Sequence, residues 1–127
     1  MGFEWKDDVI YDELWDAIPS TAVSKGDAEV VQDTFGFWVK DRESAGEEIA
    51  FIYRCRQVLA TKVTGTGEDI TAGDRLYYIV ASSAVSKTAT GTAGTDYYYC
   101  GTAKKNATAT ATTVLMRFDG TRYDEAI

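Results

Sequence analysis

Short stretches of alternating apolar and polar residues recur along most of the chain. In residues 75–80, Leu76, Tyr78 and Val80 share one face of an extended strand, and the residues between them share the other. Runs of β-branched and aromatic residues separated by Gly, Ser and Asp are typical of strands joined by turns. We expect strands at residues 28–32, 35–39, 48–53, 57–63, 75–80, 97–103 and 112–118.

The last of these stretches places Val114, Met116 and Phe118 on one face. Residues 82–95 consist almost entirely of Ser, Thr, Ala and Gly, and we expect a long hairpin connection there that begins with a weak strand near 84–88. The whole pattern predicts an all-β fold of about seven to eight short strands. A small β-sandwich and a partly open β-barrel fit this pattern equally well.

The same kind of turn precedes three of the expected strands. It reads Ala72-Gly73-Asp74, Lys25-Gly26-Asp27 and Ala45-Gly46-Glu47, so a glycine is followed by an acid each time. Glycine reaches the positive φ that a tight turn needs, and the acid can accept hydrogen bonds from nearby backbone N–H groups. We interpret these acids as braces of the backbone rather than as catalytic groups.

The first 18 residues differ from the rest, because acids and aromatic residues are mixed there without regular alternation. Apolar residues over about 8–17 fall near helical spacing, and Pro19 would end such a helix. The alternative is an extended arm with a strand at 9–11. We favour the short helix and divide the chain into an N-terminal arm (1–18), a β domain (19–119) and a C-terminal tail (120–127).

Charge narrows the classes of partner. The chain has 127 residues, a length that suits one domain, and a net charge of −7. This charge argues against binding to nucleic acid phosphates and to anionic membranes, both of which require clustered Lys and Arg. Residues 1–18 lack the basic start and apolar core of a secretory signal, so we expect synthesis in the cytoplasm.

Residues for catalysis or metal binding are scarce. The chain has no histidine, the commonest general base and metal ligand, and its two cysteines are far apart in sequence. We expect Cys55 and Cys100 to be small buried residues, while a disulfide between them stays open. No phosphate-binding glycine motif occurs. We therefore expect no enzyme, no metal site and no cofactor.

Aromatic residues are the remaining candidates, because the chain has more of them than one small core requires. Consecutive Tyr97, Tyr98 and Tyr99 cannot all point inward from a strand. Exposed Tyr and Trp are typical anchors of protein interfaces. Our candidates for an interface are Trp5, Tyr11, Trp15, Trp38, Tyr97 and Tyr99.

The order of these motifs resembles the bacteriophage head decoration, or capsid cement, family of small β proteins. The resemblance covers about residues 20–118 and leaves out the aromatic N-terminus, the Thr-rich insert near 82–95 and the C-terminal tail. The motifs that carry it are Val23-Ser24-Lys25-Gly26-Asp27, Phe35-Gly36-Phe37, Ala45-Gly46-Glu47, Ile70-Thr71-Ala72-Gly73-Asp74-Arg75-Leu76-Tyr77, Gly101-Thr102-Ala103 and Thr112-Thr113-Val114.

This resemblance implies a structural virion protein on the outside of a mature capsid, made in the host cytoplasm. The implied partner is the major capsid protein, whose subunits it would bridge, and the implied assembly is a homo-oligomer, with a trimer favoured. The aromatic N-terminus would then contact the coat, while a strand edge or the tyrosine run would hold the oligomer. The alternative is another phage or surface β module, such as a tail or fibre component or a carbohydrate-binding domain.

Overall fold

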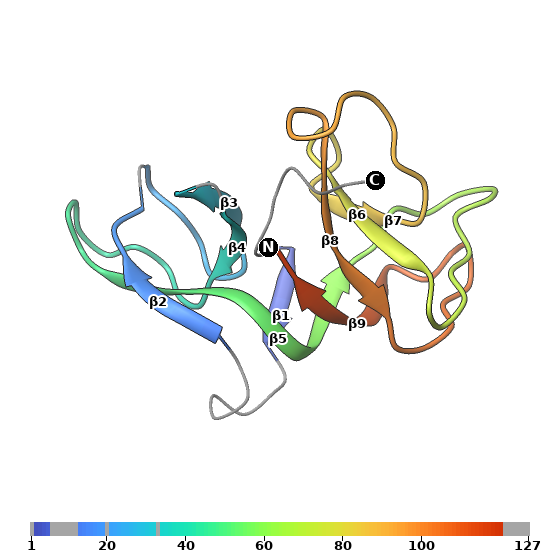
Figure 1. Cartoon of the computed structure of the whole chain (residues 1–127), viewed down its shortest axis with the longest axis horizontal. Coiled ribbons are helices and arrows are strands. Elements are labelled where there is room, and N and C mark those ends of the chain that lie inside the picture. The colour runs from blue at the N-terminus through green and yellow to red at the C-terminus, as the bar shows by residue number, and fades with distance from the viewer. Residues whose placement is uncertain (1, 6–12, 20, 33, 121–127) are drawn as a thin grey trace.

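The computed structural model describes residues 2–5, 13–19, 21–32 and 34–120 (Figure 1), and its regular elements there are all strands. The all-β prediction is therefore confirmed. No helix long and apolar enough to cross a membrane occurs among the described residues. The strands are β1 (Phe3–Trp5), β2 (Glu13–Ala17), β3 (Ala28–Val31), β4 (Thr34–Trp38), β5 (Ile49–Thr61), β6 (Arg75–Ile79), β7 (Ala84–Ser86), β8 (Tyr97–Ala103) and β9 (Thr113–Asp119).

The strands form one curled sheet in the order β3-β4-β5-β9-β8-β6-β7, and β1 and β2 also pair with β5. All of these strand pairs are antiparallel. The sheet curls far enough to bring β7 back to the end of β5, where the Val63 N–H donates to the Val85 carbonyl at 2.9 Å. The architecture is thus a curled, half-barrel sheet, one of the two arrangements that the sequence left open.

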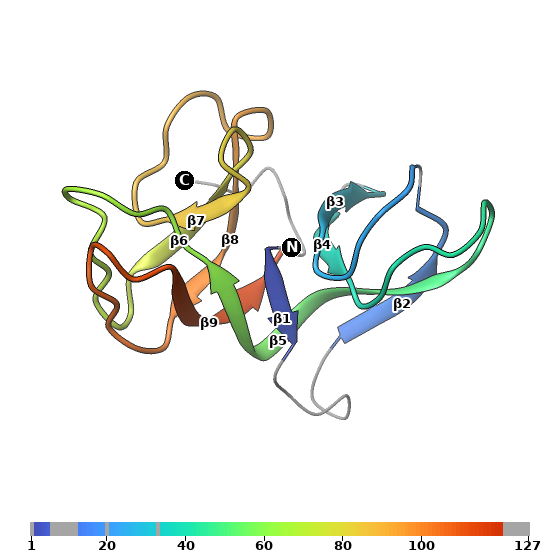
Figure 2. The same cartoon turned by 180° about the vertical axis from the view of Figure 1, so that it is seen from behind.

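The long strand β5 runs through both halves of the molecule (Figures 1 and 2). One lobe contains β2, β3, β4 and the first part of β5, and the other gathers β6, β7, β8 and β9. The sequence predicted two separate strands, 48–53 and 57–63, where the structure has the single strand β5, and polar residues interrupt the apolar pattern between them near Arg54 and Arg56. The interruption is instead a register shift between Cys55 and Val58 in the pairing with β9. A bulge of this kind bends a strand without ending it.

Aromatic rings fill the main core between the two lobes. Phe118 packs edge-on against Phe3 and Phe37, with ring centroids 4.9 and 5.1 Å away, and Phe35 lies 5.8 Å from it. All four side chains are buried. A second cluster contains Trp38, Ile49 and Phe51, in the lobe of β2, β3 and β4. Because Phe3 belongs to the first cluster, the N-terminal strand is part of the core.

The predicted alternation holds in β9, where Val114, Met116 and Phe118 are all buried. It holds only partly in β6. Leu76 is buried and Tyr78 packs against the core, but Val80 is 43% exposed, because the strand ends at Ile79 before Val80 is reached.

Cys55 and Cys100 are both buried, which confirms the prediction of small buried residues. Both are free cysteines, so the disulfide that the sequence left open is not formed. Both belong to the main core. Burial also raises the pKa of the Cys100 thiol far above its ordinary value, so this thiol stays neutral. The two residues therefore act as small apolar side chains.

The helix predicted over 8–17 is wrong for residues 13–17, which form β2 and pair with the first part of β5. Sheet pairing satisfies the backbone of this segment through long-range contacts that helical spacing does not reveal. The alternative strand at 9–11 lies outside the described residues. The division of the chain at residue 18 stays a prediction, although both described strands of this segment pair with β5.

Replacement of Phe3 by alanine tests whether the N-terminal strand stabilises the domain. We expect Phe3→Ala to lower the free energy of unfolding by about 3–5 kcal/mol, because it opens a cavity among the core rings. Urea unfolding followed by tryptophan fluorescence measures this. The control is Val80→Ala, at a side chain that is 43% exposed, with an expected change within about 0.5 kcal/mol. Equal stability of the two variants would contradict the placement of Phe3.

Candidate functional site

Three tyrosines lie together on the outer side of β6 and β8. The ring of Tyr77 lies edge-on to those of Tyr97 and Tyr99, at centroid distances of 5.6 and 6.1 Å. Tyr98 points the other way, where it stacks on buried Phe35 at 5.0 Å. The tyrosine run is therefore split as expected, with its middle residue on the core and the residues on either side of it on the outer face.

An arginine joins this tyrosine cluster. The Arg75 guanidinium lies 4.2 Å from the centre of the Tyr99 ring, and Arg75 Nε donates to the Tyr77 hydroxyl at 3.3 Å. Partial burial raises the pKa of the Tyr99 phenol, and the positive charge of Arg75 partly opposes that rise. Tyr99 therefore stays neutral and acts as a hydrogen-bonding aromatic group rather than as an anion.

Basic side chains extend the cluster across β9 and β5. Arg75 lies opposite Thr102 in the sheet, and Thr102 lies opposite Arg117, so the three residues form a row across neighbouring strands. Thr102 and Arg117 also line a shallow pocket of about 500 Å³ together with Arg56, Gln57 and Lys104. We call the whole surface the Tyr–Arg face and define it by Arg56, Arg75, Tyr77, Tyr97, Tyr99, Lys104 and Arg117.

The composition of the Tyr–Arg face fits protein binding. Tyr and Arg are enriched among residues that dominate interface energies, because they combine large apolar area with polar groups. Stacking of Arg75 on Tyr99 also restrains both side chains before a partner arrives, which lowers the entropy cost of binding. All residues of the face except Lys104, which directly follows β8, lie on strands, so the sheet fixes the geometry of most of the face.

Trp38 lies away from this face. Its side chain is 0% exposed, it packs on Phe51 at 4.8 Å, and its indole Nε1–H donates to Glu29 Oε1 at 3.0 Å. Its place on β4 between two other strands explains the burial. Trp38 is therefore a core residue of the chain, and we leave it out of any interface.

The other sequence candidates lie in the N-terminal part. Trp5 is in β1 opposite Val58, and Trp15 is in β2 opposite Phe51, so both are held on β5 at different points along it. Tyr11 lies outside the described residues. The structure thus brings Tyr97 and Tyr99 together on one face, and it places Trp5 and Trp15 on strands other than those that carry the tyrosines.

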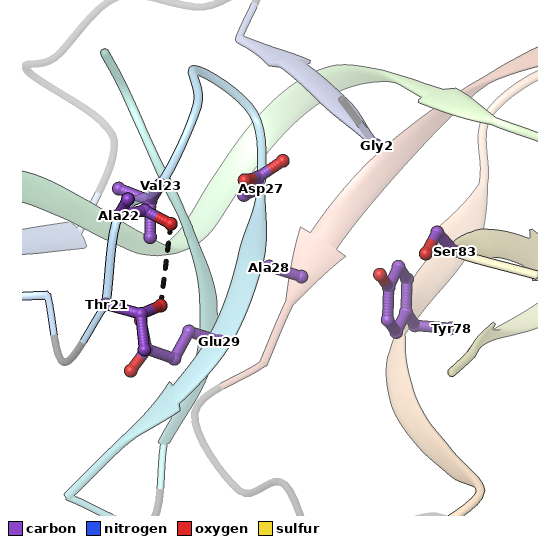
Figure 3. A pocket seen from close by; sticks show the side chains of 9 residues that line it. All are labelled: Gly2, Thr21, Ala22, Val23, Asp27, Ala28, Glu29, Tyr78 and Ser83. Carbon is purple, nitrogen blue, oxygen red and sulfur yellow. Dashed lines mark hydrogen bonds between the residues drawn. The ribbon is translucent and has the colours of Figure 1, made fainter. Parts of the chain in front are cut away.

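A pocket of about 450 Å³ lies between the lobes, with Tyr78 and Ser83 on one side and the segment around Asp27 and Glu29 on the other (Figure 3). Its two acids already hold other groups. Asp27 accepts the Ser24 N–H, and Glu29 accepts the Trp38 indole. No group of three or more His, Cys, Asp or Glu residues suited to a metal occurs in the described part of the chain. The Tyr–Arg face is therefore the better candidate.

The acids of the repeated turns brace the backbone, as the sequence indicated. In the third turn Gly73 has a φ of 95°, the Asp74 N–H donates to the Thr71 carbonyl at 3.0 Å, and the Asp74 carboxylate accepts the Thr71 N–H at 2.8 Å. The same pattern of a positive-φ glycine and a carboxylate bound to a backbone N–H occurs in the other two turns. The N–H donors to Asp27 and Glu47 are those of Ser24 and Glu43, at 2.8 and 2.7 Å.

Sequence reasoning missed the basic part of the site. The alternation of β6 and β9 already places Arg75, Tyr77 and Arg117 on faces opposite the core. The sequence does not reveal that β6 and β9 both pair with β8, and this pairing joins their outer faces into one surface.

In the comparisons with known proteins, a family model described as phage cement protein matches residues 12–118. The match includes all strands from β2 to β8 and nearly all of β9. The searches of curated proteins and of solved structures give no match.

Replacement of a turn acid tests its bracing role. We expect Asp74→Ala to lower the free energy of unfolding by about 1 kcal/mol, because the Thr71 N–H loses its carboxylate partner. Asp69→Ala is the matched control. Asp69 is 62% exposed and pairs with Lys87 at 3.6 Å, so its loss should change stability by less than about 0.5 kcal/mol. Chemical denaturation measures both, and an unchanged Asp74→Ala midpoint would contradict the brace.

Proposed function

Because the chain belongs to the phage cement protein family, whose members are structural proteins that stabilise phage capsids, we propose that it acts from outside the mature capsid. It binds the outer surface of the shell and bridges neighbouring subunits of the major capsid protein. Its place is then the exterior of the virion.

The observation that supports a binding role most directly is the Tyr–Arg face. It offers a fixed arrangement of three tyrosines and several cations on a rigid sheet, and the described polar groups at its centre contact one another. Such a surface suits contact with another protein better than catalysis. The structural character of the family agrees with the absence of enzymatic activity that we expect.

Stabilisation of the capsid follows from mass action. A protein that binds the mature shell and binds its precursor less tightly shifts the equilibrium toward the mature state. Linked copies gain avidity, because each additional contact forms at high effective concentration. We therefore propose a homo-oligomer, with a trimer favoured, in which Trp5, Tyr11 and Trp15 contact the coat and Tyr97 and Tyr99 lie between copies.

Binding to capsids tests this function. We expect the protein to cosediment saturably with expanded capsids of its phage, to bind unexpanded shells more weakly, and to raise the temperature at which expanded capsids rupture. The physical reason is preferential binding to one state of the shell. Bovine serum albumin serves as a control for trapping. Failure to bind expanded capsids would overturn the proposal.

The proposed role of the N-terminal aromatic residues needs point variants, because removal of residues 1–18 would also remove Phe3 from the core. We expect Trp15→Ala to weaken capsid binding by roughly tenfold or more, as loss of an interface anchor does. Val80→Ala, at a side chain 43% exposed, is the control and should bind like the wild type. A Trp15→Ala protein with unchanged affinity and unchanged melting temperature would contradict this role.

A further inference from the structure

Opposite charges are separated along this chain. Residues 13–53 contain nine Asp and Glu and three Lys and Arg, a net charge of −6, whereas residues 54–119 contain five and eight, a net charge of +3. The overall charge of −7 hides this division. An acidic chain thus carries a basic segment that makes up about half of its length.

The fold turns this division in sequence into a division in space. The described residues of 13–53 form the lobe of β2, β3, β4 and the first part of β5, and residues 54–119 form the rest of β5 together with β6 to β9 (Figure 1). The Tyr–Arg face belongs entirely to the second lobe. Within it, Lys104 and Arg117 are exposed cations beside one pocket.

The acidic lobe has a surface that complements this face. Asp16 and Glu48 are both exposed, and they line a hollow of about 390 Å³ with Ile18 and Gln32. Ile18 is 55% exposed, which is the highest exposure among the large hydrophobic side chains described. We call these four residues the acidic patch. An apolar group flanked by carboxylates suits a partner that presents aromatic rings flanked by cations.

We propose that the Tyr–Arg face of one copy binds the acidic patch of a second copy of this chain. The proposal rests on the homo-oligomer of the proposed function and names its two contact surfaces. The chain itself supplies both halves of the contact. Arg117 and Lys104 face Asp16 and Glu48 of the neighbour, and the tyrosine rings cover its Ile18.

This contact is head-to-tail, because two different surfaces meet. A two-fold dimer through either surface alone would bring like charges together, which is unfavourable. Repetition of a head-to-tail contact gives a ring when the rotation closes. The charge pattern therefore favours a cyclic oligomer over a symmetric dimer, in keeping with an odd number of copies such as three.

Charge reversal on each side tests the contact. We expect Arg117→Glu and Glu48→Lys each to weaken self-association by roughly tenfold or more, since each sets like charges against each other. The double variant carries both reversals, restores opposite charges across the contact and should recover most of the association. Lys87→Glu is the matched control, because it makes the same change of charge on the basic lobe outside the Tyr–Arg face.

Sedimentation velocity over a range of protein concentrations, at low and high salt, gives the readout, and thermal melts verify that each variant is folded. We expect weaker association of the wild type at high salt, where surface charges are screened. Equal loss in Lys87→Glu, or no recovery in the double variant, would overturn the proposal.

Capsid binding by the same proteins separates the two proposals. A wild type that stays monomeric yet binds expanded capsids overturns the head-to-tail contact and leaves the cement function standing. A salt-sensitive oligomer that fails to bind capsids overturns the cement function and leaves the head-to-tail contact standing. If Arg117→Glu stays oligomeric and loses capsid binding, the Tyr–Arg face contacts the coat instead, and the proposed contact between copies is wrong.

Discussion

Hydrogen bonding along β5 is the constraint on which the rest of the structure depends. Among the described strands, β1, β2, β4 and β9 all pair with it, so its 13 residues organise both lobes. The register shift between Cys55 and Val58 bends the strand between the two sets of partners. β5 also contributes residues to both hydrophobic clusters, Ile52, Cys55, Val58 and Ala60 to the main core and Ile49 and Phe51 to the cluster around Trp38.

The features that could be predicted from the sequence are those that depend only on the residues of one short segment. The turn of Thr71 to Asp74 closes through its own glycine and its own carboxylate, so the bracing role of Asp74 can be inferred without the rest of the chain. The alternation of Val114, Met116 and Phe118 likewise needs only a strand and a core. These local rules were sufficient for the all-β class and for most strand positions.

The features that sequence reasoning missed depend on long-range pairing. Residues 13–17 have helical spacing, but β5 offers them an edge to pair with, and this pairing decides their structure. Trp38 looks like a surface anchor until β4 is placed beside β5, which buries it. The stacking of Arg75 on Tyr99 exists only because β6 and β8 are paired in one register, which alternation within either strand does not specify.

The separation of charge has a structural consequence of its own. The two lobes share β5, so the spacing between the acidic patch and the Tyr–Arg face is set by one hydrogen-bonded strand rather than by a flexible linker. A fixed angle between two complementary surfaces is what a closed ring of copies requires, since a variable angle would also permit open chains. The bend of β5 would then determine how many copies close the ring. In this way the strand that stabilises the monomer would also set the geometry of the assembly.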